Sequence, residues 1–442
     1  MKRCSTDVRR RTIRPFRRGA VIFGLVITLL TTGATLLAAQ EKEEELLGDR
    51  ETQETASMRE ATYKELAKAQ EAAEAEKYSD AIRILDKLRN DELNSYELSQ
   101  ALNLYAYIYY SQDNYPKAIQ TYEQLLSQPD LPEALQTPTV YTLSQLYFST
   151  ENWRKAIEML NRWFDLGAEP QTQTYELMAQ AYYQLGEFRN ALQPASQSIE
   201  LTRKSGKPVK EQSYLLLRVL YYELEDYNQV AAVLQELIKR FPKKQYWMQL
   251  AGVYGELGNE RKQISTLELA YLLEYLDTET EVMTLAGLLL QNDVPYKAGK
   301  ILAKGLEDGV ISSTYDHWRL LSQAWTLAKE DEKAVPALTR AAGLSENGEL
   351  DIILGQTYMN LEQWDAAVQA LRTGISKGSL DRADQAQVML GQSFFNMNAF
   401  DEAREAFKAA QADRRSRQLA AQWLNYIDSE ENRQARLSEA LE

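Results

Sequence analysis

One spacing of large and small residues recurs ten times along the chain. Each copy begins at a residue that we call the anchor. A small residue usually follows three positions later, with apolar residues four and seven positions after the anchor, as in WRKAIEMLNRW from Trp153. Successive anchors lie 33–39 residues apart, so the chain is limited to an array of similar supersecondary units. The anchors are Tyr78, Tyr115, Trp153, Phe188, Tyr227, Glu260, Pro295, Asp331, Trp364 and Phe400.

A second pattern precedes each anchor. A large apolar residue and a small residue stand ten and nine positions before it, often with an aromatic residue six before, as in Met178, Ala179 and Tyr182. Apolar residues at this spacing line one face of a helix. Short turns such as QLGE at 184–187 join the two patterns. The unit is therefore helix–turn–helix with a period of about 34 residues, and it resembles the tetratricopeptide repeat.

This resemblance implies an all-α fold, a right-handed α-solenoid of about ten tetratricopeptide-like repeats. A single short amphipathic helix is marginal in water, whereas stacked units bury a continuous core. We expect the solenoid over residues 58–413. We expect a capping helix and a polar tail over residues 414–442, because Leu419, Trp423 and Ile427 share one helical face.

Prolines test the helical interpretation. The segment NDVPYKAGKIL places Pro295 at an anchor, where a helix is expected to start. Proline is compatible with the first helical turn, and Asn292 or Asp293 is a candidate N-cap. Pro194 and Pro336 are expected inside second helices, where proline bends a helix.

The N-terminus has the marks of a secretory signal. Residues 1–18 carry eight basic residues against one acid, and an uncharged apolar run follows from Gly19 to Gln40. We interpret residues 1–39 as a cleaved signal peptide or, alternatively, an uncleaved membrane anchor. Residues 40–57 are charged and aperiodic, and we expect a linker there. Either interpretation predicts a periplasmic body, with membrane contact only through an uncleaved N-terminal segment.

The composition argues against catalysis. Without residues 1–39 the chain has 42 basic and 63 acidic residues and no cysteine, so nucleic acid is not expected as a partner. His317 is the single histidine, so no metal site is expected. It precedes Trp318 inside a helical stretch, which indicates a surface or packed residue and not a catalytic Ser–His arrangement. No glycine loop for phosphate binding is present. We predict a protein that is not an enzyme and that uses no cofactor and no metal.

Repeat proteins of this kind bind partners along their first helices. If the family geometry holds, the positions eight and five before each anchor face a groove. Aromatic and glutamine side chains there suit an extended, proline-rich peptide. The alternative is that the rings only pack between helices. The candidate residues are Tyr107, Tyr110, Gln145, Phe148, Gln180, Tyr183, Tyr222, Gln323, Gln356, Gln392 and Phe395.

Glycines stand at three of the same positions, in the middle of the array. They are Gly252, Gly255 and Gly287. Two interpretations are open. The absence of a side chain either admits the backbone of a partner or permits tighter packing between helices.

Several segments resemble one bacterial group more closely. They include LNSYELSQALNLYAYIYYSQDNYPKAI (93–119), FPKKQYWMQLAGVYGELG (241–258) and NDVPYKAGKIL (292–302). These are similar to periplasmic tetratricopeptide proteins that accompany TonB, ExbB and ExbD-type systems of Gram-negative bacteria. The resemblance implies association with such a system and nothing about individual binding residues. Our first hypothesis is a periplasmic adaptor that binds a protein or peptide partner, with a periplasmic segment of a TonB- or ExbD-type component as the candidate. The alternative is an assembly or secretion adaptor for outer-membrane or exported proteins.

Overall fold

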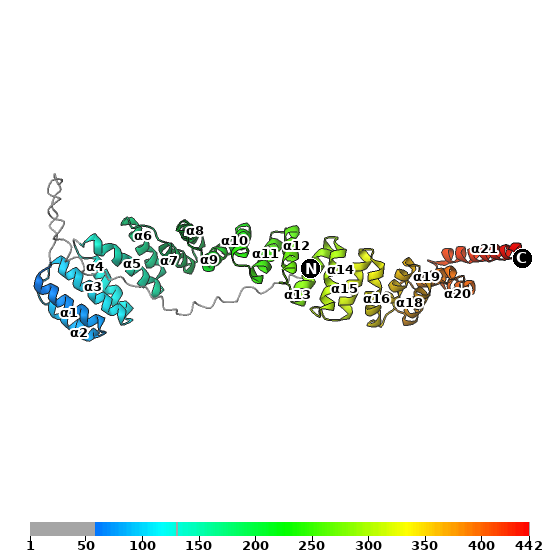
Figure 1. Cartoon of the computed structure of the whole chain (residues 1–442), viewed down its shortest axis with the longest axis horizontal. Helices are drawn as coiled ribbons and strands as arrows, with labels where there is room; N and C mark the ends of the chain where they lie inside the picture. The colour runs from blue at the N-terminus through cyan, green and yellow to red at the C-terminus, as the bar shows by residue number, and fades with distance from the viewer. Residues whose placement is uncertain (1–57, 130, 442) are drawn as a thin grey trace, which may run out of the picture. The chain divides into compact units, whose positions relative to one another are not determined.

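The computed structural model describes residues 58–129 and 131–441, and the predicted signal and linker lie outside them. Those residues form helices and no strands (Figure 1). The described residues divide into two compact units, with the boundary between Ala101 and Leu102. The helices are α1 (Glu60–Glu74), α2 (Tyr78–Arg89), α3 (Ser95–Ser111), α4 (Tyr115–Leu126), α5 (Glu133–Ser149), α6 (Trp153–Asp165), α7 (Thr172–Gln184), α8 (Phe188–Lys204), α9 (Glu211–Glu223), α10 (Tyr227–Arg240), α11 (Lys244–Glu256), α12 (Glu260–Leu272), α13 (Glu279–Gln291), α14 (Pro295–Glu307), α15 (Tyr315–Leu327), α16 (Asp331–Gly343), α17 (Glu349–Asn360), α18 (Trp364–Lys377), α19 (Ala383–Asn396), α20 (Phe400–Gln411) and α21 (Arg417–Leu441).

Each even-numbered helix from α2 to α20 begins at one of the ten predicted anchors. Helices α1 to α20 are therefore ten helix–turn–helix repeats, and α21 follows the last of them. We number the repeats one to ten in chain order. The predicted all-α solenoid of about ten repeats is confirmed.

In the first unit, α1 and α2 pack together. Arg59, which precedes α1, binds the buried Glu97 of α3, with 2.9 Å from Nε to Oε1. The Arg59 guanidinium lowers the pKa of Glu97 to about 2. This ion pair holds the start of α1 against the start of α3.

In the second unit, every helix from α4 onward packs against the next one along the chain (Figure 1). The residues seven positions after the anchors form the centre of this packing, and all ten in the chain are at most 5% exposed. They face the small residues nine positions before the anchors. A Cβ added to Gly391, for example, would lie 2.7 Å from the ring of Phe407. Small residues thus let the two helices of a repeat approach closely.

The turn between the two helices has the same backbone in every repeat. The residue two positions before the anchor has a positive φ in all ten repeats, and it is glycine only at Gly186 and Gly258. The next amide then donates to a carbonyl five residues earlier, as from Asp226 N to Tyr221 O at 2.9 Å. This is the Schellman ending of a helix, in which glycine is the favoured residue. Eight repeats therefore place a residue with a side chain in a strained conformation.

Glu225, with φ of 57°, provides a test of this strain. Glu225→Gly is expected to raise the free energy of unfolding by about 1 kcal/mol, because an L residue in this conformation costs about that much relative to glycine. Gly186→Ala, at the equivalent position of repeat four, is expected to lower it by a similar amount. Thermal and urea unfolding of the two variants would measure both effects. Changes of the same sign in both variants would contradict this account.

Pro295 is the first residue of α14, as predicted. The predicted N-cap is wrong, because Val294 occupies that position and Asp293 is the residue with positive φ, at 57°. The Schellman turn needs one residue between its strained position and the next helix, which moves the cap to Val294. Pro194 and Pro336 lie inside α8 and α16, as predicted.

Helix α21 packs against α20 and continues past Asp428 as far as Leu441. It begins 34 residues after α19, where an eleventh first helix would stand. Asn425 and Asp428 then replace the packing residues Gly391 and Phe394 of α19. With polar residues at these two positions, α21 does not offer the apolar contact surface on which a second helix packs in the other repeats.

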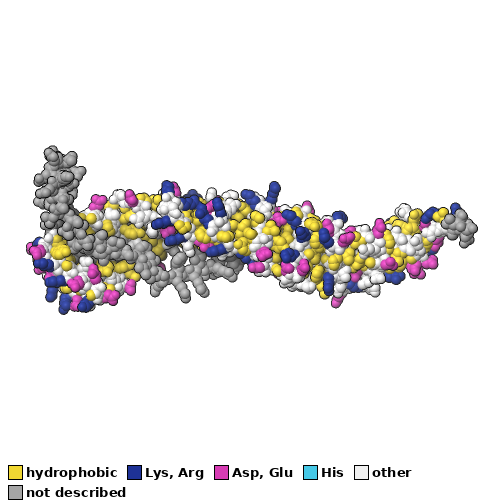
Figure 2. Space-filling view, in the orientation of Figure 1, with side chains coloured by type: hydrophobic (Ala, Val, Ile, Leu, Met, Phe, Trp, Pro, Cys, Tyr) yellow, Lys and Arg dark blue, Asp and Glu magenta, His cyan; other side chains and the backbone are white. Residues whose placement is uncertain are grey.

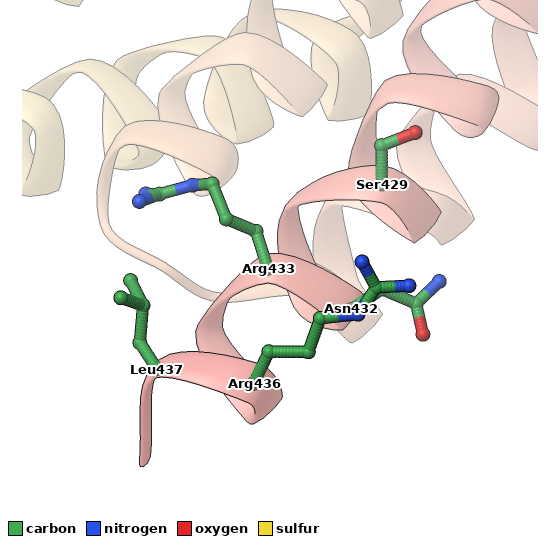
Figure 3. Close-up of a pocket in the computed structure, with 5 residues that line it drawn as sticks. All are labelled: Ser429, Asn432, Arg433, Arg436 and Leu437. Carbon is green, nitrogen blue, oxygen red and sulfur yellow. The ribbon is translucent and has the colours of Figure 1, made fainter. Parts of the chain in front are cut away.

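The distal part of α21 carries a shallow pocket, lined by five residues of this helix (Figure 3). Arg433 and Leu437 point to one side, and Asn432 and Arg436 lie on another. Since the pocket is made by one helix alone, it is not a cavity between repeats.

Candidate functional site

The predicted groove residues all lie in the second half of a first helix in the second unit. Helices α3, α5, α7, α9 and α19 contribute the aromatic ones. The glutamines come from α5, α7, α15, α17 and α19. The candidate site is therefore a series of equivalent positions on successive first helices.

Each aromatic side chain five positions before an anchor packs against the anchor ring of its own repeat. The ring centroids are 4.8–6.0 Å apart in all five cases. Two of these pairs are edge-to-face and three are tilted, and aromatic pairs in such contact are favourable beyond the area that they bury. The pairs are Tyr110–Tyr115, Phe148–Trp153, Tyr183–Phe188, Tyr222–Tyr227 and Phe395–Phe400.

These rings also remain partly exposed. Tyr222 is 48% exposed, and Tyr107, Tyr110, Phe148, Tyr183 and Phe395 are half-buried. Hydrophobic side chains are visible among charged ones on the surface of the second unit (Figure 2). Each ring is thus held by its own repeat and still presents part of its surface to solvent. At the C-terminal end, Phe395 also contacts Trp423 and Tyr426 of α21, which cover much of that position.

The glutamines differ in their surroundings. Gln180, Gln323 and Gln356 are exposed, whereas Gln145 and Gln392 are half-buried. Gln356 donates to Asn360 at 3.1 Å. An amide side chain that reaches solvent can donate to and accept from the backbone of an extended peptide.

The surroundings of the glycines in the middle of the array distinguish between room for a partner backbone and tighter packing between helices. A Cβ at Gly252 or Gly287 would meet no atom within 4 Å, so tighter helix packing does not explain either glycine. A Cβ at Gly255 would lie 2.9 Å from Nε2 of Gln263, the end of a flexible side chain. The helices therefore carry glycine at Gly252 and Gly287 at a cost in helix propensity with no packing gain.

Gly252→Ala and Gly287→Ala are each expected to raise the free energy of unfolding by about 1 kcal/mol, since alanine favours a helix interior and meets open space here. Urea unfolding would measure the effect. Gly391→Ala is the control, because its Cβ would overlap Phe407. It is expected to destabilise the protein by about 1–3 kcal/mol. A loss of stability in Gly252→Ala would contradict this account, because it would mean that Gly252 is needed for helix packing.

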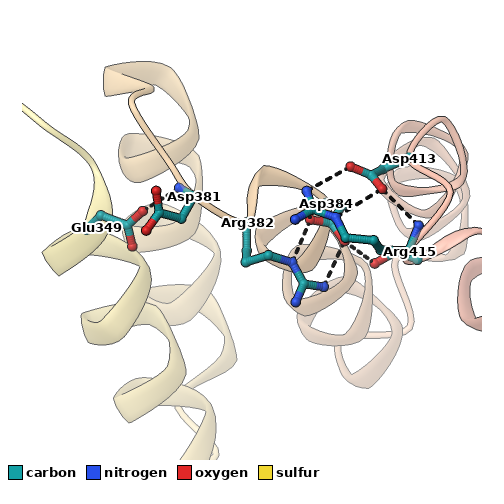
Figure 4. Close-up of polar contacts among 7 residues, drawn as sticks. Glu349, Asp381, Arg382, Asp384, Asp413 and Arg415 are labelled. Carbon is teal, nitrogen blue, oxygen red and sulfur yellow. Dashed lines mark hydrogen bonds and ion pairs between the residues drawn. The ribbon is translucent and has the colours of Figure 1, made fainter.

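Polar contacts of a second kind join successive repeats. A carboxylate in the first turn of a first helix accepts a hydrogen bond from the loop before the next first helix. Glu279 accepts from the amide of Ser312 at 2.8 Å, and Glu349 accepts from the amide of Asp381 at 2.7 Å (Figure 4). These bonds couple neighbouring repeats, and the sequence did not reveal them because their partners lie 32–33 residues apart.

Asp384 is the most buried of these carboxylates, with its side chain 1% exposed. It accepts from Arg382 at 3.0 Å and from the hydroxyl of Ser416 at 2.6 Å, and Arg415 lies 3.2 Å away (Figure 4). The Arg382 guanidinium is the main cause that holds the pKa of Asp384 well below its usual range. Asp384 therefore joins α19 to the start of α21.

In residues 58–129 and 131–441, no group of three or more His, Cys, Asp or Glu side chains is placed to hold a metal ion. Within the same ranges no helix combines the length and the apolarity needed to cross a membrane. His317 lies in the first turn of α15. Its Nδ1 is 2.7 Å from the carbonyl of Ser312, and its Nε2 is 3.7 Å from Glu279. The histidine thus belongs to the contacts between repeats.

Sequence reasoning missed Arg218 in α9. It stands nine positions before an anchor, where the other nine repeats carry Ala, Ser or Gly. The sequence signal that could have identified it is a charged residue at a position where the other repeats carry small residues.

Family models match two parts of the chain. One for the tetratricopeptide repeat matches residues 66–133 and 354–425. A second, for subunit 3 of the anaphase-promoting complex, or cyclosome, matches residues 111–198. The first description names the repeat itself, and neither description names a catalytic domain.

Among curated proteins, the signal recognition particle subunit SRP72 of Dictyostelium discoideum is 34% identical over 101 residues. The match covers 23% of this chain and spans only 13% of that relative's length.

Several solved structures are similar at low identity. A tetratricopeptide-repeat protein from Parabacteroides merdae is 15% identical, with 60% of this chain and 98% of that chain covered and a TM-score of 0.34. MamA is 19% identical, with 39% and 92% covered and a TM-score of 0.32. YrrB, described as a tetratricopeptide-repeat protein with an unusual peptide-binding site, is 13% identical, with 46% and 94% covered and a TM-score of 0.33.

The family-model matches lie near both ends of a series of ten helix pairs, and each pair has the same register of anchors and the same turn. The chain therefore contains tetratricopeptide repeats at residues 66–133 and 354–425, within an all-α solenoid of ten helix–turn–helix units.

Proposed function

We propose that the protein is a non-enzymatic periplasmic adaptor. In this proposal it binds an extended segment of a partner protein along its first helices, and the partner belongs to a TonB/ExbB/ExbD-type transport system. The observation that carries the proposal is the series of partly exposed rings at equivalent positions of repeats two to five. A partner that contacts one ring meets another at the same place in the next repeat.

The chemistry of the series supports an extended partner. Each ring is already fixed by its anchor, so little side-chain freedom is lost when a partner binds. Proline-rich segments dock on aromatic surfaces because their extended conformation is formed beforehand. The acidic body of the protein favours a partner that is basic as well.

Two observations from the sequence support the location and the system. The basic and apolar N-terminus is typical of a segment that directs export. The segments at 93–119, 241–258 and 292–302 resemble proteins that accompany TonB systems. Neither observation depends on the arrangement of the helices.

Site-specific photocrosslinking in cells tests the proposal. A photoreactive amino acid at Tyr183 or Tyr222 is expected to crosslink a TonB- or ExbD-type protein in the periplasmic fraction. The control site is Leu272 of α12, a second-helix residue that is 73% exposed. Equal crosslinking at Leu272 would contradict the first-helix surface. Crosslinks to outer-membrane or exported proteins would instead support the envelope-assembly alternative, and a cytoplasmic protein would contradict the location.

A further inference from the structure

Arg218 breaks the pattern of small residues that lets the two helices of a repeat approach. The equivalent positions of the other nine repeats are at most 3% exposed where they carry alanine or serine, and the remaining two are buried glycines. These residues are Ala69, Ala106, Ser144, Ala179, Ala251, Ala286, Ser322, Gly355 and Gly391.

The position has no room for a long side chain. In repeats nine and ten, a Cβ at Gly355 or Gly391 would already lie 2.6–2.7 Å from the residue seven positions after the anchor. In repeat five that residue is Leu234, which is fully buried. Helices α9 and α10 accordingly pack less extensively than the pairs α7–α8 and α11–α12. Arg218 thus weakens the packing of its own repeat.

The Arg218 side chain instead reaches the next repeat. Its NH1 donates to Oε1 of Gln249 on α11 at 2.9 Å. Its Nε is buried and has no acceptor. Throughout the described ranges, no carboxylate lies within ion-pair distance of Arg218. The guanidinium therefore has at least one unpaired N–H group, and its hydrogen-bond partner, Gln249, is neutral.

Arg218 is half-buried, and desolvation without a counter-ion is unfavourable for a guanidinium. Desolvation lowers the pKa of Arg218, and the nearby Tyr246 and Tyr222 oppose this shift only in part. Arg382 and Arg404, by contrast, both bind carboxylates. A desolvated charge is normally paired, so the missing anion beside the half-buried Arg218 is the feature that needs an explanation.

We propose that Arg218 binds a side-chain carboxylate of the peptide segment that occupies the first helices. This inference rests on the proposed peptide-binding function. Tyr222 lies four residues later on the same face of α9 and is 48% exposed, so an acidic residue at Arg218 has an aromatic surface beside it. Gly252, in the next first helix, leaves space for the segment to continue. The planar fork of arginine suits a carboxylate, which accepts two parallel hydrogen bonds.

Selection from a phage-displayed library of random peptides of about twelve residues tests the inference with the full chain. Peptides bound by the wild type are expected to be enriched in Asp or Glu at one shared position, while their remaining residues are basic or neutral because the body of the protein is acidic. An acidic peptide selected in this way is expected to bind Arg218→Gln about tenfold more weakly or worse, because a charge-assisted bond is lost. Arg189→Gln, which removes an exposed charge from α8, is the control and should bind as the wild type does.

A stability measurement separates this role from a structural one. Arg218→Ala restores the small residue of the other repeats and is expected to unfold at the same or a higher temperature while it loses the preference for acidic peptides. If the wild type selects peptides with no acidic enrichment, or Arg218→Gln keeps the enrichment, the inference is overturned and peptide binding stands. If the wild type selects no peptides, the proposed function fails with it. A less stable Arg218→Ala with unchanged selection would make Arg218 structural.

Discussion

Replacement of Asp384 by asparagine is expected to lower the free energy of unfolding of the C-terminal helices by about 3 kcal/mol. The side chain is 1% exposed and accepts bonds from Arg382 and Ser416, with Arg415 beside it. Loss of the carboxylate charge removes the ion pairs with Arg382 and Arg415. It also places an amide NH2 group, itself a donor, beside the donors of these residues and of Ser416. Because α21 depends on this contact, the effect should be local to α19–α21.

Hydrogen exchange resolved by segment is the suitable measurement, since a repeat array need not unfold in one step. Amides of α21 are expected to exchange faster in Asp384→Asn, while those of α5–α8 keep their wild-type rates. Asp401→Asn is the matched control, because Asp401 is 97% exposed and lies 3.6 Å from Arg404. Faster exchange of α21 amides in the Asp401→Asn control as well would contradict the claim that Asp384 specifically stabilises α21.

The same carboxylate predicts a pH dependence. Its folded pKa lies below the unfolded value of about 3.9, so the folded protein binds fewer protons at this group. The stabilisation is therefore complete above about pH 4 and is lost as the pH falls further toward the folded pKa. Protection of α21 in the wild type should decline over that acidic range, and Asp384→Asn should show a smaller decline.

Gly348→Ala is expected to destabilise repeat nine by about 2–3 kcal/mol. A Cβ at Gly348 would lie 2.0 Å from the carbonyl oxygen of Gly374 in α18, and backbone atoms cannot move aside as a flexible side chain can. The amide of Gly348 also donates to the carbonyl of Gly378 at 3.1 Å. Displacing the start of α17 would therefore strain a second contact.

Gly343→Ala is the control for this substitution. Gly343 is the last residue of α16, and a Cβ there would meet nothing within 4 Å. Its free energy of unfolding is expected to stay unchanged or to rise by up to about 1 kcal/mol. Urea unfolding of the two variants side by side would measure the difference. Equal stability of Gly348→Ala and the wild type would show that α17 and α18 separate at little cost.

The site was predictable only in part. The spacing from the anchors placed Tyr183 and Tyr222 correctly on first helices, because residue positions on a helix follow from sequence alone. It did not show that each ring packs on the anchor of its own repeat and stays partly exposed. That outcome depends on the angle between two helices. For Gly252 and Gly287, sequence left two explanations open, and the empty space around them removed one.

The sequence by itself determined the number of repeats, the register of all ten anchors and the all-α class, because periodic apolar residues and helix starts are local properties. Only the tertiary structure decided where polar groups meet across repeats. Glu349 and Asp381 are 32 residues apart, as are Asp384 and Ser416, and Gly348 touches Gly374 through a contact of backbone atoms. The bond from Arg218 to Gln249 and the unpaired Nε of Arg218 belong to this second group, although the charge at a position of small residues was visible in the sequence. Such contacts depend on how helices stack, and stacking places residues together at distances that no local pattern encodes.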